Sequence, residues 1–466
     1  MRRPSLKFRL PLDPHTPGFS FFARWGGGPL LLTDDSPASP EDFESLPLAA
    51  GVQLHVRRTT LFKSVWVDVF QPRLMQPVAV TQLALLARLL ERGTSRLSDL
   101  RALNRHTDWL YGAALSAQAI AVGPFQLLHL HYDAVDEVFV PDAEEDLLAC
   151  GMRLLGEVLT DPFLEDGRLP DARVEQEKSS LRRYVDSVYA DRSLLAQRRA
   201  MERMCAGSPW ALLAHGDPAE LCGLDGSGLL QLLRDLIVTV PMHVYVCGNV
   251  NSEQVADLCT RYLPCVDRAD PVDQIPDLPS PAAPRRVRET DDVSQGRLVL
   301  GFRTNVSLRS ADGEYAALVL LNLLFGGDAH SRLYSRIRED QGLCYYIGSY
   351  TEPMSGLLFV EAGVEPADQP QLLDQVLGEL LDLATVGPTA LETQRSKELA
   401  SQRLESAEDG RDGLVRFHLS RRLAGVDTSR RQLLGALESV TPAQIRAVAA
   451  STVLDTEYYL APRDVS

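Results

Sequence analysis

The 466-residue sequence lacks most features of secreted and membrane proteins. Its seven cysteines, an odd number, are scattered from Cys150 to Cys344 without a C-x-x-C pair, which favours a reducing compartment over a disulfide framework. It has no run of about 18 or more apolar residues, so no membrane span is expected. The N-terminal stretch has basic residues but no continuous apolar core, which makes it a poor signal peptide. These absences predict a cytoplasmic protein that does not bind a membrane.

Clustered positive charge is also missing. The formal net charge is −16, and no long basic run is present. Because binding a phosphate backbone needs clustered Lys and Arg, nucleic acid is not an expected partner. The glycine-rich "LLFGGDAHS" lacks the Lys-Ser/Thr of a phosphate loop, and no Ser or Cys lies in a recognisable nucleophile motif. What the chain does contain is a hydrophobic fraction of 45 %, enough for the cores of at least two domains.

Composition divides the chain into four segments. Residues 1–45 are rich in Pro, Gly, Ser and Asp, which predicts an extended or disordered arm. Residues 264–288 contain six prolines, a density that favours a semi-rigid linker over helix or central strand. The flanking segments, 46–263 and 289–466, show similar successions of strand and helix patterns. The predicted fold is therefore α+β, with two homologous domains, each a mostly antiparallel sheet covered by helices.

An internal repeat supports this division. A shift of 234 positions places Gly93 on Gly327 and Tyr111 on Tyr345. The same shift aligns four apolar helix positions of the first half, Leu86, Leu89, Leu90 and Leu103, with Leu320, Leu323, Leu324 and Ile337 of the second. One ungapped register thus matches two helices and the start of the next strand, which indicates two copies of one domain.

Three stretches resemble the pitrilysin/insulinase family of zinc metallopeptidases, and the resemblance covers roughly residues 50–465. They are "LLARLLERGTSRLSDL", "VEQEKSSLRRYVDSVYADR" and "SRLYSRIREDQGLCYYIGSY". The first lies where active members carry the inverted zinc motif H-x-x-E-H, the second resembles the family's Glu-rich helix, and the third is the most specific. The resemblance implies a half-length chain of bacterial type, and such chains tend to be the zinc-free partner of an active homologue.

The zinc motif itself is degenerate. Counting back from Arg-Gly-Thr gives the positions of the family's motif in this chain. Ala84 and Arg88 stand where the family has its two histidines, and Ala87 stands where it has its glutamate. The chemistry needs two imidazoles one turn apart and a carboxylate base. Alanine has no donor atom, and a protonated guanidinium repels a dication. The family's third ligand, a glutamate, falls on Tyr184 or Val185, neither of which is a carboxylate. The resemblance therefore implies no metal and no catalytic residue in this chain.

The third stretch keeps a functional pair of the family. Family members carry an Arg, then six residues, then a Tyr in this stretch. Both side chains point toward the active site of the opposing domain and hydrogen-bond the backbone carbonyls of the bound peptide. Arg338 and Tyr345 have this spacing. A guanidinium and a phenol both donate hydrogen bonds that suit carbonyl oxygens or a developing oxyanion. We expect these two residues to contact substrate.

The sequence thus predicts the non-catalytic subunit of a zinc metallopeptidase complex. A homologous zinc-bearing subunit would be its partner in a heterodimer, and an unfolded peptide would be the substrate. One alternative is a peptidase-derived binding or assembly protein with no proteolytic role. A second is a self-contained metal hydrolase that uses His129, His131 and Asp133 of "HLHYD", which share one face of a predicted strand.

Overall fold

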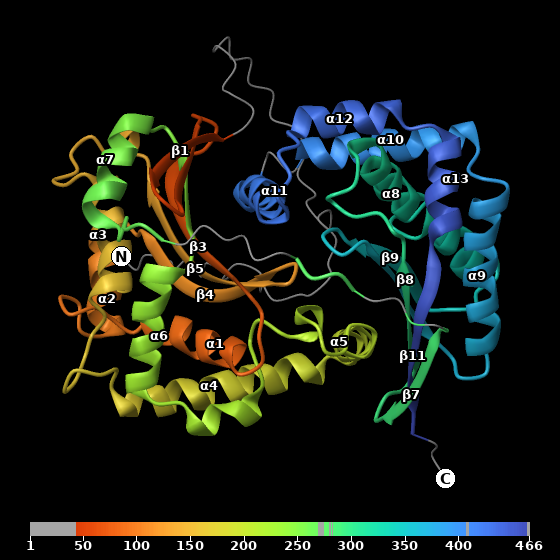
Figure 1. Ribbon diagram of the computed structural model, residues 1–466, viewed down its shortest axis with the longest axis horizontal. Coiled ribbons are helices and arrows are strands. Elements are labelled where there is room, and N and C mark those ends of the chain that lie inside the picture. The colour runs from red at the N-terminus through yellow and green to blue at the C-terminus, as the bar shows by residue number, and fades with distance from the viewer. Residues whose placement is uncertain (1–42, 269–274, 279–280, 282, 407–409, 464–466) are drawn as a thin grey trace, which may run out of the picture.

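The computed structural model describes residues 43–268, 275–278, 281, 283–406 and 410–463. Its strands form two sheets (Figure 1). The first has the order β1 (Glu44–Ala49), β2 (Val52–Arg58), β6 (Met242–Gly248), β3 (Ser64–Leu74), β5 (Phe125–Val135) and β4 (Ala114–Val122). The second has the order β7 (Arg285–Asp291), β11 (Val453–Pro462), β8 (Gly296–Arg303), β10 (Leu357–Val364) and β9 (Tyr346–Glu352).

The two sheets repeat one topology. The pairs β2/β6 and β7/β11 are parallel, and the other neighbouring strands are antiparallel. Strand β1 is the extra strand of the first sheet. The aligned leucines of the two halves, such as Leu86 and Leu320, are buried in both. The predicted α+β class with mostly antiparallel sheets is confirmed.

Most helices cover the outer face of a sheet, and two lie between the sheets (Figure 1). The helices of the first half are α1 (Ala79–Leu90), α2 (Leu100–Trp109), α3 (Leu147–Thr160), α4 (Asp171–Ala190), α5 (Arg192–Met204), α6 (Gly226–Thr239) and α7 (Ser252–Tyr262), with short 3₁₀ turns at η1 (Glu137–Phe139), η2 (Pro209–Ala211) and η3 (Pro218–Gly223). Those of the second are α8 (Asp312–Phe325), the π-type η4 (Leu333–Asp340), α9 (Gln369–Thr385), α10 (Ala390–Ser406), α11 (Arg411–Ala424), α12 (Arg430–Ser439) and α13 (Pro442–Ser451). No helix in the described ranges is both long and apolar enough to cross a membrane.

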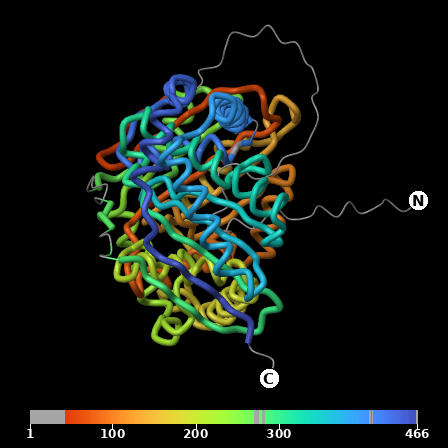
Figure 2. Tube along the Cα trace, turned by 90° about the vertical axis from the view of Figure 1, so that its right-hand side faces the viewer, coloured from red at the N-terminus to blue at the C-terminus, as the bar shows by residue number. Residues whose placement is uncertain are grey.

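Each half has its own core, and a third core joins them. Helix α1 buries Leu83, Leu86 and Leu90 against the first sheet, as expected for leucines at helical spacing. The joining core contains Tyr245 of β6 and Phe359 of β10, together with side chains of α5 and α11. These two helices lie between the sheets (Figure 1), and in Figure 2 the last strand runs down the second half toward the C-terminus.

The predicted segment boundaries need two corrections. Residues 285–288 were expected in the linker, but they belong to β7, which pairs with β11. The charged sequence RRVRETD of this edge strand carries almost no apolar signal, which is why composition misassigned it. Strand β1 begins at Glu44, inside the predicted arm. Residues 1–42 and several positions of the predicted linker lie outside the described residues, so the division into two domains stays a prediction.

Candidate functional site

The degenerate zinc motif lies on α1, and the expected third ligand lies on α4, which packs against it. Ala84 and Ala87 are buried in the core of the first half. The guanidinium of Arg88 lies over the ring of Tyr184, 5.5 Å from its centroid, in a cation–π contact. Val185 is 0 % exposed and packs in the core. Of the two expected positions, Tyr184 therefore contacts the motif residue Arg88, and Val185 is a core residue. We call Ala84, Ala87, Arg88 and Tyr184 the α1/α4 site.

Charged groups surround this site. Arg92, just after α1, forms an ion pair with the buried Glu177 of α4. Glu91 accepts a hydrogen bond at 2.8 Å from the backbone N–H of Ala117 on the edge strand β4. Burial is the main cause that raises the pKa of Glu91, and the nearby charge of Glu177 adds to it. Sequence reasoning missed Glu91, because its partner is a backbone group that no motif marks.

Arg338 and Tyr345 lie together beside the second sheet. The Nε–H of Arg338 donates to the Tyr345 carbonyl at 2.9 Å, and its guanidinium lies 4.6 Å from the ring centroid of Tyr334. Within the described residues, Nη1 and Nη2 of Arg338 have no hydrogen-bond partner. Tyr345 is 51 % exposed. Its hydroxyl donates to Glu365 at 2.6 Å, and this carboxylate is the main cause that raises the pKa of Tyr345.

A buried arginine fixes the helix that presents Arg338. Arg332, immediately before η4, donates to Glu392 at 2.8 Å and 3.1 Å and to Asp382 at 2.6 Å. These carboxylates lie on α10 and α9. Although burial opposes it, the hydrogen bond from Arg332 contributes most to lowering the pKa of Glu392 to about 2. Arg332, which belongs to the third stretch that resembles the family, therefore has a structural role.

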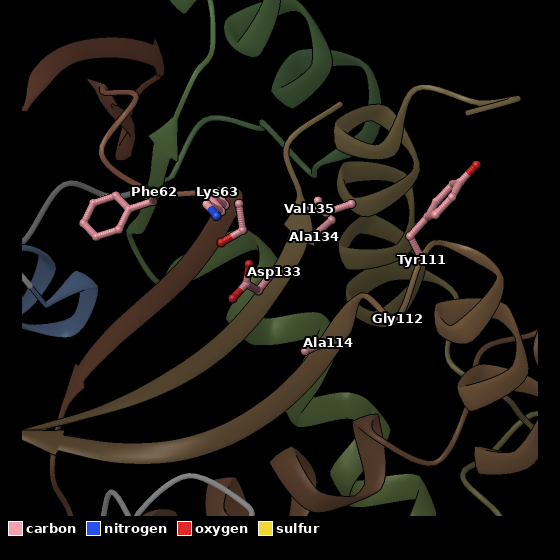
Figure 3. A pocket seen from close by; sticks show the side chains of 9 residues that line it. Phe62, Lys63, Tyr111, Gly112, Ala114, Asp133, Ala134 and Val135 are labelled. Atoms are coloured by element: carbon pink, nitrogen blue, oxygen red, sulfur yellow. The ribbon is translucent and has the colours of Figure 1, made fainter. Parts of the chain in front are cut away.

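The sequence grouped His129, His131 and Asp133 as possible metal ligands. In the structure the carboxylate that lies with the two histidines is Asp68, and not Asp133. Both histidines hydrogen-bond Oδ1 of Asp68 on β3, at 2.6 Å from His129 Nε2 and 2.7 Å from His131 Nδ1. Asp133 instead lines a cavity of about 400 Å³ with Lys63. Figure 3 shows Asp133 near Lys63, at the ends of the strands. We call Asp68, His129 and His131 the sheet triad.

Similarity to known proteins agrees with this architecture. Residues 235–399 match the family model of the "Peptidase M16 inactive domain". A Bacillus subtilis protein described as "Probable inactive metalloprotease YmfF" is 28 % identical over 413 residues, which cover 88 % of this chain and 96 % of that protein. The chain is therefore similar to inactive M16-type peptidases. The predicted pitrilysin/insulinase resemblance is therefore confirmed.

Solved structures show the M16 fold over nearly the whole chain. A conserved protein from Enterococcus faecalis superposes with a TM-score of 0.84 at 21 % identity, covering 91 % of this chain and all of the other. A peptidase M16 inactive domain from Pseudomonas fluorescens superposes with a TM-score of 0.72 at 16 % identity, covering 90 % of this chain and 98 % of the other. The α1/α4 site of this chain contains two alanines, an arginine and a tyrosine, and none of these is a histidine or carboxylate ligand for zinc.

Proposed function

We propose that the chain is the non-catalytic subunit of a heterodimeric zinc peptidase. A homologous subunit carries the zinc, and this chain supplies Arg338 and Tyr345 in trans to a peptide held between the two. The observation that carries the proposal is the hydrogen bond from the Arg338 side chain to the backbone carbonyl of Tyr345, which keeps Arg338 beside the exposed Tyr345 side chain. The positions where zinc ligands were expected in this chain hold Arg88 and Tyr184.

The geometry of the pair suits carbonyl recognition. The bond from Arg338 Nε to the Tyr345 carbonyl fixes the guanidinium plane and leaves both terminal amino groups as donors for a ligand. The hydroxyl of Tyr345 is committed to Glu365. A peptide carbonyl must therefore displace Glu365 before the hydroxyl can donate to it.

The edge strands of the chain support a role in trans. An extended peptide binds a sheet edge through unpaired backbone groups. On β4, the N–H of Ala117 donates to Glu91. On β9, the N–H of Ser349 donates to the carbonyl of Gly326 at 2.9 Å. At these two edges a backbone donor is already satisfied within the chain. In the proposed complex the peptide therefore pairs with the zinc-bearing subunit and contacts this chain through side chains.

The proposal is tested by capture followed by reconstitution. The tagged chain is isolated from lysate of its source cells, and the co-purified chain is identified and analysed for zinc. Cleavage of an unfolded peptide is then measured for each chain alone and for the mixture. We expect a homologous zinc-bearing chain and activity in the mixture only. Full activity of that chain alone would favour the assembly-protein alternative, and activity of this chain alone would favour the self-contained hydrolase.

A further inference from the structure

Polar side chains form a band across the first sheet. In register, the strands β2, β6, β3 and β5 place His55, Tyr245, Asp68 and His131 in one row. His243, Phe70 and His129 form the next row. Asp68 alternates with Val67 and Val69, which pack in the helix-covered core. Asp68 therefore points to the opposite face, where Phe70 packs in the core that joins the two halves.

Histidines in this band, and His418 of α11 beside it, have two kinds of electrostatic surroundings. Burial, with the charge of Arg422, lowers the pKa of both His243 and His418 to about 4. Burial also lowers the pKa of His131, but the hydrogen bond and charge of Asp68, with the charges of Asp133 and Asp412, outweigh it and raise this pKa. His243 and His418 thus lie near the positive charge of Arg422, whereas His131 lies beside the carboxylate of Asp68.

The sheet triad presents three ligand atoms to one point. Asp68 Oδ1, His129 Nε2 and His131 Nδ1 lie within 4.8 Å of one another. Asp68 has a side chain only 8 % exposed, while those of His129 and His131 are 20 % and 27 % exposed. A buried carboxylate is costly unless a cation compensates it. The exposure of the two imidazoles gives an ion a path to the site.

We propose that Asp68, His129 and His131 bind a divalent transition-metal ion, of which Zn²⁺ is the best-matched common example. Two imidazoles and one carboxylate form a donor set that Zn²⁺ accepts, with a fourth position left for water. The ion needs a lone pair on the ring nitrogen that now faces Asp68. A neutral imidazole therefore binds it with its one proton on the other ring nitrogen, and a protonated imidazole first releases one proton to solvent. Zinc–ligand bonds near 2.0–2.1 Å place ligand atoms about 3.3 Å apart in a tetrahedron, so the triad opens slightly on binding.

This ion would bridge β3 and β5, at a place separate from the α1/α4 site. The α1/α4 site lies behind the opposite face of the sheet, where Ala84 and Leu83 pack with Val67 and Val69. The expected role is structural, because the ion ties two strands beneath the core that joins the halves. It revises the expectation from sequence that this chain holds no metal.

Zinc binding by the purified chain alone tests the proposal, so its result does not depend on the partner. Isothermal titration with Zn²⁺, and absorption spectroscopy with Co²⁺, are applied to the metal-free wild type. We expect one equivalent and a rise in the melting temperature, because the ion binds the folded state. His129→Gln and His131→Gln should each weaken binding at least about tenfold, because loss of even an outer-shell partner of a ligand costs about 10–100-fold in affinity.

Matched variants separate the triad from its neighbours. Asp68→Asn should weaken binding to the same extent. Asp133→Asn and the surface variant His330→Ala should bind almost as the wild type does. If Asp68→Asn fails to fold, the two histidine variants still decide the question. Absence of zinc binding in the wild type, or unchanged binding in both histidine variants, would overturn the proposal.

Discussion

The guanidinium of Arg88 lies over the aromatic ring of Tyr184, where the family resemblance places two zinc ligands on facing helices. A cation and an aromatic ring attract each other, so the replaced pair holds α1 to α4 without a metal. The neighbouring ion pair of Arg92 and Glu177 adds a second link between these elements. Contacts that need no metal therefore connect these two helices.

Rebuilding the motif should require four changes and not three. Ala84→His, Ala87→Glu and Arg88→His restore two ligands and the base, but Tyr184 still leaves the third ligand missing. We expect tight zinc binding only after Tyr184→Glu is added. Zinc content is measured in a His131→Gln background, so that the sheet triad does not contribute. One equivalent of tight zinc in the three-change variant would contradict this reading.

The same variants should lose stability. Ala84 and Ala87 are 5 % and 1 % exposed, so larger side chains there overpack the core at a cost of about 1–3 kcal/mol each. Urea unfolding of the single variants measures this cost. Arg88, which is only partly buried, provides the control, since Arg88→His should cost less than either alanine change.

Glu91 should make the chain less stable as the pH rises. Its pKa is raised in the folded state, chiefly by burial, so the folded state holds this proton more tightly than the unfolded state does. The stabilisation is complete below the ordinary glutamate pKa and is lost as the pH rises through the folded-state value. Glu91→Gln keeps an acceptor for the Ala117 N–H and removes the buried charge. We expect its free energy of unfolding to match or exceed that of the wild type at pH 7.

Two comparisons check this assignment. The advantage of Glu91→Gln over the wild type should shrink as the pH falls toward 4. Glu91→Ala removes the acceptor as well and should cost about 1–3 kcal/mol if the N–H of Ala117 is left unpaired. A Glu91→Gln variant that is less stable than the wild type at pH 7 would show that the neighbouring arginines, and not burial, dominate at this carboxylate.

The sequence predicted those parts of the molecule that depend on local periodicity. Leucine spacing located α1 and its repeat α8, and both are buried as expected. It left Tyr184 and Val185 as alternatives, because a shift of one residue turns a helical side chain by roughly 100°. It could not find Asp68, which lies 61 residues from His129, because strand order decides which side chains become cross-strand neighbours. The charged edge strand β7 escaped detection for lack of an apolar pattern.

The anchor at Arg332 should control the acid stability of the second half. The lowered pKa of Glu392, about 2 against an ordinary 4.5, means that its contribution is present above pH 4.5 and is lost as the pH falls toward 2. Arg332→Met should destabilise the protein by about 1–3 kcal/mol at pH 7, because it leaves the partly exposed carboxylates of Glu392 and Asp382 without their cation. Thermal unfolding between pH 2 and 7 measures the difference in stability between the wild type and Arg332→Met. This difference should become smaller as the pH falls toward 2. A constant difference would assign the effect to packing alone.

Arg338 and Tyr345 should matter only in the assembled peptidase. A donor aimed at an oxyanion is worth roughly 10²–10³ in rate, and a ground-state contact less, so we expect Arg338→Ala and Tyr345→Phe to lower kcat/KM by about ten-fold to a thousand-fold. Complex formation and the zinc content of the partner should not change. Arg338→Lys should recover only part of the activity. Tyr111, the repeat equivalent of Tyr345, is 50 % exposed, and Tyr111→Phe is therefore the matched control, expected to be silent.

Glu365 sharpens this test, because it holds the hydroxyl that the substrate needs. Glu365→Ala should release the Tyr345 hydroxyl and lower its pKa toward the ordinary value, since the carboxylate is the main cause of the rise. A peptide carbonyl then has no competitor, and KM should fall. In the Tyr345→Phe background the same change should have no effect, because the hydroxyl is already absent. Steady-state kinetics of the four proteins form a double-mutant cycle. An equal effect of Glu365→Ala in both backgrounds would mean that the carboxylate acts independently of Tyr345, and near-wild-type activity of Tyr345→Phe would reject a substrate contact through its hydroxyl.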